Sequence, residues 1–252
     1  MRGKAAAKFC LSYDPPLAVP CDMTHDRQNG ALIAQTIVLN MDKTAIRKGA
    51  EKMELTQVKT VKVIAALLLL SAITQPIYTA LFLGAPDVAG RNAIWGLEGL
   101  VFVFLTAFAG SALVMAKRYT LGFSALAFSA VLNVIQVGVG YTLFEPFSQA
   151  AEANAELRSI SFSIVIFGFF VYNAAKIMLG MAAVVFGIAN TNQGRKALGG
   201  ITTIVGAVAI VANALVLMLG ITGAFPSPIA GGSGVVATVL LAICLLSLNK
   251  DE

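Results

Sequence analysis

The chain has 252 residues, of which 58% are hydrophobic and only 12% are charged. Soluble domains carry about a quarter charged residues, so this composition argues against an ordinary soluble protein and favours an integral membrane protein. The single histidine, His25, and the widely separated Cys10, Cys21 and Cys244 argue against a zinc site, a haem held by two histidines or a Ser-His-Asp triad in the apolar region.

The net charge of +5 raises the question of nucleic-acid binding. Most of this excess comes from residues 1–62, which precede the first long apolar segment. Basic residues beside a first membrane span are typical of the side of a membrane protein that stays in the cytoplasm. We therefore expect no nucleic-acid partner, and we expect the lipid bilayer to surround the rest of the chain.

The first 62 residues differ in composition from the remainder. Residues 1–40 contain three prolines and no apolar periodicity, which predicts a disordered N-terminal tail or an over-extended start upstream of Met41 or Met53. Residues 41–62 are rich in lysine and predict a basic juxtamembrane helix. This helix could lie on an anionic leaflet, but the preferred interpretation is a basic flank that holds the first span inside.

Six apolar segments follow, and each has about 20 residues or more, enough to cross a hydrocarbon core of about 30 Å. A membrane β-barrel would instead show short alternating strands. The sequence predicts an all-α polytopic integral membrane protein, with a six-helix transmembrane domain over residues 63–248. The predicted spans are residues 63–83, 93–116, 119–144, 160–190, 198–222 and 229–248.

The loops between these spans predict the orientation. The turns that contain Lys117–Arg118 and Arg195–Lys196 alternate with a more acidic loop at residues 145–159. Because basic loops stay inside, both termini are expected in the cytoplasm, and the plasma (inner) membrane is the expected location. The long loop begins with Glu145 and Pro146 and predicts a short outer helix lying over the bundle.

The fourth span carries polar residues at its centre, which is unusual for an apolar helix. Asn173 and Lys176 follow each other at helical spacing, with small residues on the same face and large apolar residues opposite. A lysine at this depth costs roughly 2.5–3.5 kcal/mol on insertion scales, and it is too far from either end to reach water. Lys176 is therefore expected to be neutral, paired or facing water.

Further amides lie at a similar depth in the other spans. Counting about 1.5 Å per residue from the outer ends places them about 12–16 Å deep, with Lys176 at about 20 Å. The sequence predicts one polar layer that gathers these side chains around Lys176. For the amides by themselves, hydrogen bonding between helices is the preferred interpretation, and a role in a pathway is the alternative. The amides are Gln75, Asn133, Gln136, Asn173 and Asn213.

Glu98 is the acid that falls inside a predicted span. The same count places it about 8 Å deep, so direct pairing with the deeper Lys176 looks strained. We expect Glu98 to pair with Arg91 or Arg158 at the outer rim. An entrance carboxylate that accepts protons or cations is the alternative.

Two functions fit this pattern. The first is a small transporter or permease-like protein whose pathway runs along the polar layer around Lys176, Asn173, Asn133, Gln136, Asn213, Gln75 and Glu98. The alternative is a non-catalytic structural or assembly subunit, whose small-residue seams bind partner membrane subunits or a second copy. We expect no enzymatic activity, no catalytic residues, no cofactor and no metal. In a transporter, Lys176→Met should preserve the fold and abolish activity.

Overall fold

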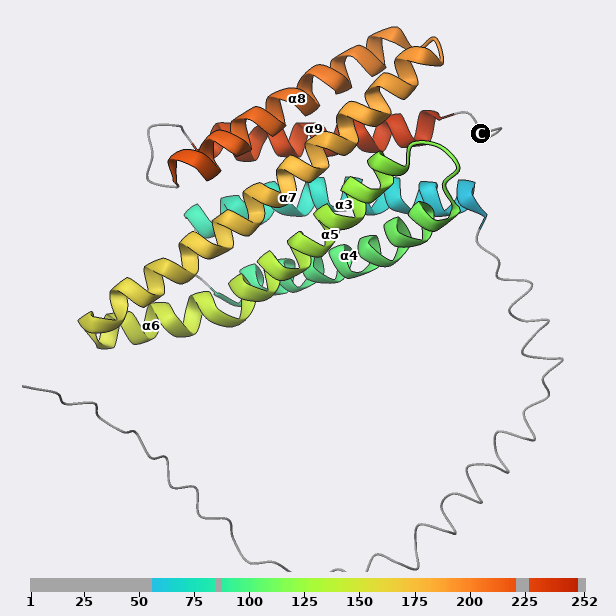
Figure 1. Ribbon diagram of the computed structural model, residues 1–252. Helices are drawn as coiled ribbons and strands as arrows, with labels where there is room; N and C mark the ends of the chain where they lie inside the picture. The colour runs from blue at the N-terminus through green and yellow to red at the C-terminus, as the bar shows by residue number, and fades with distance from the viewer. Residues whose placement is uncertain (1–55, 85–87, 221–226, 249–252) are drawn as a thin grey trace, which may run out of the picture. The chain divides into compact units, whose positions relative to one another are not determined.

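The computed structural model describes residues 56–84, 88–220 and 227–248, and within these ranges the chain is helical without strands (Figure 1). The elements are α3 (Gln57–Gly84), α4 (Val88–Met115), α5 (Thr120–Val139), a π-helix η1 (Gly140–Phe144), α6 (Glu145–Ala153), a short 3₁₀ turn η2 (Ala155–Leu157), α7 (Arg158–Asn192), α8 (Lys196–Leu219) and α9 (Ser227–Ser247).

Six helical stretches in the described ranges are long and apolar enough to cross a membrane. This confirms the prediction of an all-α chain with six membrane-type helices. The predicted tail at residues 1–40, and residues 41–55 of the predicted basic helix, lie outside the described residues. From Gln57 onward the basic segment is continuous with the first long helix, α3.

Five of the long helices pack as a closed ring in which each helix contacts its neighbours. The order around the ring is α3, α4, α5, α7 and α9, and α9 returns to contact α3. The sixth helix, α8, packs outside this ring against α7 and α9. Fully buried apolar side chains from all five ring helices meet in its interior, among them Leu68, Phe102, Leu105, Leu126, Leu179, Phe186 and Leu241.

The contact between α7 and α8 depends on pairs of glycines. A Cβ built on Gly180 would lie 2.8 Å from the carbonyl oxygen of Gly206, and one on Gly187 would lie 2.8 Å from that of Gly199. Only residues without a side chain let two helix backbones approach this closely. The small-residue seams of α7 and α8 therefore pack against each other within the same chain.

The segment after the third long helix continues as helix. The α5, η1 and α6 stretch runs without interruption over Thr120–Ala153, and with α7 it forms a hairpin that extends past α3 and α4 at one end (Figure 1). The short outer helix expected over residues 145–159 is thus an extension of α5 and does not lie over the bundle. The π turn directly precedes Pro146, whose ring would collide with the residue 142 carbonyl in a regular α-helix.

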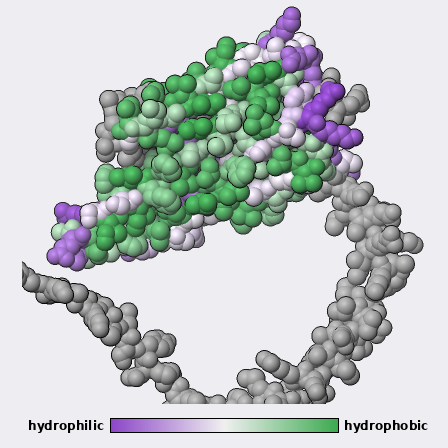
Figure 2. Space-filling view, in the orientation of Figure 1, coloured by the Kyte–Doolittle hydropathy of each residue, from purple (hydrophilic) through white to green (hydrophobic). Residues whose placement is uncertain are grey.

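Charged residues concentrate at the two ends of the helical body. Figure 2 shows a broad apolar band between a polar tip, at the end of the hairpin, and a polar surface at the opposite end. The opposite end carries the basic residues of the turns and of the start of α3: Lys59, Lys62, Lys117, Arg118, Arg195 and Lys196. Helices that cross an apolar band in alternating directions bring these turns to the same end.

Candidate functional site

Lys176 lies in the interior of the helical ring and is 1% exposed. Its Nζ donates a hydrogen bond of 2.8 Å to Oε1 of Gln75 on α3. The same Nζ lies 5.1 Å from the ring centroid of Tyr172, a distance at which an aromatic face attracts a cation. A Cβ on Gly234 would lie 2.8 Å from Lys176 Cδ, so glycine on α9 leaves room for the lysine stem.

Glu98 on α4 completes this polar contact. It is 4% exposed, its carboxylate accepts a hydrogen bond from the side chain of Gln75, and it attracts Lys176 electrostatically. The amide of Gln75 therefore bridges a base on α7 and an acid on α4. We call these three residues, Glu98, Gln75 and Lys176, the buried triad.

The triad corrects the expected depth difference between Glu98 and Lys176. Residue counting from the outer ends assumed that all six helices end at one level. The hairpin of α5–α6 with α7 instead extends beyond α3 and α4 (Figure 1). Counting along α7 at about 1.5 Å per residue therefore overestimates the depth of Lys176 relative to Glu98.

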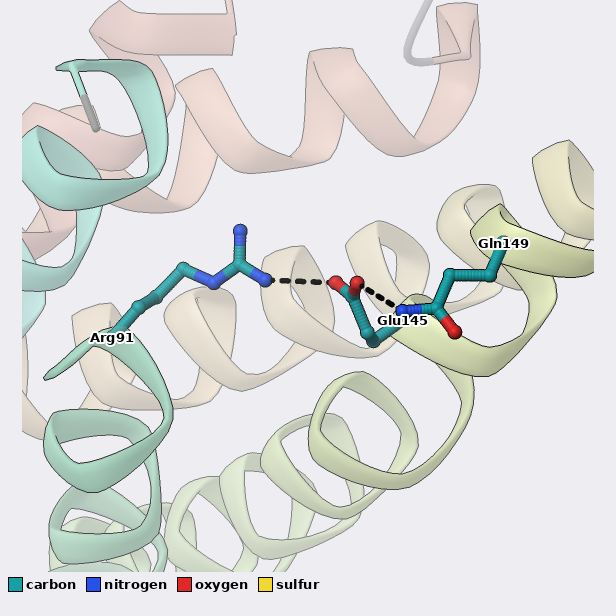
Figure 3. A network of polar contacts seen from close by, with 3 residues as sticks. All are labelled: Arg91, Glu145 and Gln149. Atoms are coloured by element: carbon teal, nitrogen blue, oxygen red, sulfur yellow. Dashed lines mark hydrogen bonds and ion pairs between the residues drawn. The ribbon is translucent and has the colours of Figure 1, made fainter. Parts of the chain in front are cut away.

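The expected rim partner of Glu98 is also wrong, because Arg91 pairs with a different acid. Its Nη2 lies 3.0 Å from Oε2 of Glu145, the first residue of α6. Figure 3 shows the guanidinium pointing toward this carboxylate, which also accepts a 2.9 Å hydrogen bond from Gln149. Because α5 continues as helix into α6, Glu145 is held within reach of Arg91 on α4. A flexible loop would not have fixed the position of Glu145.

An aromatic cluster separates the triad from the Arg91–Glu145 ion pair. The ring centroids of Tyr78 and Trp95 lie 4.6 Å apart, and those of Trp95 and Phe144 lie 5.6 Å apart. Tyr78 and Trp95 lie one helical turn from Gln75 and Glu98, toward the end of α4 that carries Arg91. A Cβ on Gly140 would collide with the indole of Trp95, so glycine at the start of the π-helix leaves the space for this ring.

Apolar side chains close the opposite side of the triad. Phe102 follows Glu98 by one turn of α4, and Leu179 follows Lys176 by one turn of α7. Both side chains are at most 2% exposed and belong to the buried core. The triad is thus enclosed between an aromatic layer and an apolar layer.

Of the five amides expected to gather around Lys176, Gln75 is the one that hydrogen-bonds to it in the described part of the chain. Asn173 donates to the carbonyl of Phe169 in its own helix, and Asn213 donates to that of Ala230, joining α8 to α9. Asn133 donates to the Ser129 carbonyl. The half-buried Gln136 has no hydrogen-bond partner among the described residues. Asn213 therefore makes the hydrogen bond between helices that is the preferred interpretation for the amides.

Two of these amides keep an acceptor unused. The Oδ1 atoms of Asn133 and Asn213 are buried and accept no hydrogen bond from the described part of the chain. Ser129, one turn from Asn133, donates instead across the helix contact to the Ala175 carbonyl at 2.8 Å. The α5–α7 contact beside Lys176 is therefore held by a serine that the sequence pattern did not distinguish as a bridging residue.

A second polar group, around Asn190, was missed by reasoning from the sequence. Asn190 is fully buried and donates to the Cys244 carbonyl at 3.2 Å, while its Oδ1 accepts from Ser247 at 2.5 Å. Cys244 Sγ donates to Thr202 Oγ1 at 3.2 Å, which adds α8 to the same network. Its residues are far apart in the sequence, and the isolated Cys244 was the only visible signal.

Chemically, the triad places an acid and a base on either side of one neutral amide, and both are hydrogen-bonded to it. Two cavities elsewhere in the helical body have volumes of about 370 Å³ and 110 Å³, and neither is lined by a triad residue. Within the described ranges, no three His, Cys, Asp or Glu side chains are grouped to hold a metal. No protein-family model, curated protein or solved structure matches this chain.

Proposed function

We propose that this protein is a small membrane transporter in which the buried triad is the proton- or ion-coupling site. The observation that carries the proposal is the burial of Glu98 and Lys176 on different helices, joined by Gln75. Ionisable groups inside membrane spans are rare and costly, and they commonly mark proton or ion pathways. A purely structural core could use apolar residues of similar volume without loss of stability.

The layers on both sides of the triad are what a transporter in a closed state would show. Tyr78 interacts electrostatically with both Arg91 and Glu98, so polar groups continue from the outer ion pair to the triad. The aromatic layer interrupts direct access along this route, and the apolar layer seals the other side. In this proposal, movement of the Trp95 layer opens the triad to one side of the membrane.

The proposal includes an orientation and a location. The protein lies in the plasma (inner) membrane with both termini in the cytoplasm, because the described cations of the turns gather at one end. The hairpin tip with Glu145 then faces the outside. This orientation makes the Arg91–Glu145 pair the outer entrance to the triad.

The test is proton movement into proteoliposomes with pyranine inside, under a potassium gradient and valinomycin. Amino acids, sugars and organic cations are added outside as a panel. We expect flux above that of empty liposomes in the wild type and in Gln136→Leu, and loss of flux in the double variant Glu98→Gln/Lys176→Met. Equal flux in the wild type and the double variant contradicts the coupling role.

A non-catalytic subunit of a membrane complex is the second candidate. It is favoured by the separation of both cavities from the triad, since neither cavity gives water access to Lys176. Under this alternative, the triad fixes the packing of α3, α4 and α7 and carries no flux. Absence of flux in wild-type proteoliposomes with any compound of the panel would favour this function.

A further inference from the structure

A cavity at the basic end of the helical body lies far from the triad along the helices. It has a volume of about 110 Å³ and lies between the start of α3, the start of α5 and the end of α9. Its apolar wall includes Val61, Phe123 and Leu245, and its polar lining includes Lys62 and Arg118. Both cationic side chains are exposed, so they line the mouth of the cavity.

The charge around this cavity has one sign. Lys59, Lys117, Arg195 and Lys196 lie at the same end, and no acidic residue lies there among the described residues. The first turn of α5 begins at Thr120 beside the cavity, and its N–H groups add partial positive charge. The cavity therefore combines an anion-attracting mouth with an apolar wall.

We propose that this cavity binds the headgroup and upper acyl chain of an anionic phospholipid. Basic pockets between membrane helices on the cytoplasmic side attract such headgroups. In this arrangement Lys62 and Arg118 contact the phosphate, and the lipid chain lies along Val61 and the exposed Leu246. A free phosphate would satisfy the cations but would gain nothing from the apolar wall, which favours the lipid as the occupant.

The test is native mass spectrometry of the full chain in detergent, with phosphatidylglycerol compared with phosphatidylcholine of the same acyl chains. We expect tighter binding of phosphatidylglycerol, and an about 30-fold loss of that affinity in Lys62→Gln/Arg118→Gln. The matched control is Lys117→Gln/Lys196→Gln, which removes two cations from the same end outside the cavity. This control should retain most of the affinity.

Three results would overturn the proposal. The first is equal binding of both lipids by the wild type, and the second is an equal loss of affinity in the cavity variant and the control variant. The third is full displacement of phosphatidylglycerol by millimolar inorganic phosphate, which would identify a free-anion site. The single variant Lys62→Gln gives an independent measurement, with a smaller loss of affinity in the same direction.

Discussion

At the scale of single residues, the main energetic question is how a lysine remains inside a helical bundle. Lys176 is 1% exposed, and its charge faces the Gln75 carbonyl and the Tyr172 ring. Glu98 provides the opposite charge through the other end of the same amide. Buried ionic groups are costly when one partner is removed, so the three residues should behave as one unit.

The first prediction concerns this coupling. From the sequence alone, Lys176→Met is expected to preserve or increase stability while abolishing activity, because methionine removes the cost of a buried charge. The structure changes this expectation, since Lys176→Met leaves Glu98 buried without its opposite charge. We expect each of Lys176→Met and Glu98→Gln to destabilise the fold by up to about 3–5 kcal/mol, and the double variant to lose less than their sum.

Equilibrium unfolding in mixed detergent micelles measures this double-mutant cycle. Lys59→Met is the control, because it removes an exposed lysine from the same helix, α3, that carries Gln75. It should change stability little. Additive effects of Lys176→Met and Glu98→Gln would show that the two residues do not interact.

The second prediction compares two glutamines of the predicted polar layer. Gln75 bridges Lys176 and Glu98, whereas Gln136 has no hydrogen-bond partner among the described residues. Gln75→Leu should destabilise the protein by about 1–3 kcal/mol, because it leaves two buried charged groups without their shared partner. Gln136→Leu should have little effect in the same unfolding measurement. Similar effects of both changes would contradict the bridging role.

At the scale of helices, the π-helix between α5 and α6 positions the aromatic layer. Gly140 lies against the Trp95 indole, and the Phe144 ring lies within 2.8 Å of where a Gly168 Cβ would be. The same turn directs Glu145 toward Arg91. One local change of helical geometry therefore fixes both the Arg91–Glu145 ion pair and the aromatic layer beside the triad.

The third prediction tests this element with two neighbouring glycines. Gly140→Ala should destabilise the protein by about 1–3 kcal/mol, because the added methyl group collides with Trp95. Gly138→Ala should be neutral or stabilising by up to about 1 kcal/mol, because its Cβ meets nothing within 4 Å. Fluorescence of Trp95, the one tryptophan of the chain, reports displacement of the ring. An unchanged spectrum and stability in Gly140→Ala would contradict this packing.

At the scale of the whole molecule, the distribution of charge makes a prediction about topology. Ser148 in α6 and Asn192 at the end of α7 are both exposed and lie at opposite ends of the hairpin. Each is replaced by cysteine in turn. In a chain with Cys10 and Cys21 replaced by serine, an impermeant thiol reagent outside intact cells should label Ser148→Cys. It should label Asn192→Cys only after the cells are opened. The reverse pattern would invert the proposed orientation.

Some features of this protein follow from the order of its residues alone. The length and apolarity of the segments determine six membrane-type helices, because a backbone in an apolar medium must satisfy its own hydrogen bonds. The cost of burying Lys176 also identifies it as a residue that must be neutral, paired or facing water. Local composition carries both conclusions, so no knowledge of the packing is required.

Only the tertiary structure decides which groups meet. Glu98 reaches Lys176 because the ring of helices places α3 between α4 and α9, and because α7 extends past its neighbours. Asn133, Asn173 and Asn213 lie at similar computed depths but contact other groups, because depth along a helix does not specify the direction of a side chain around it. The sequence therefore determines the helices and marks Lys176 as a costly buried group, while rotation and relative height of the helices select Gln75 and Glu98 as its partners.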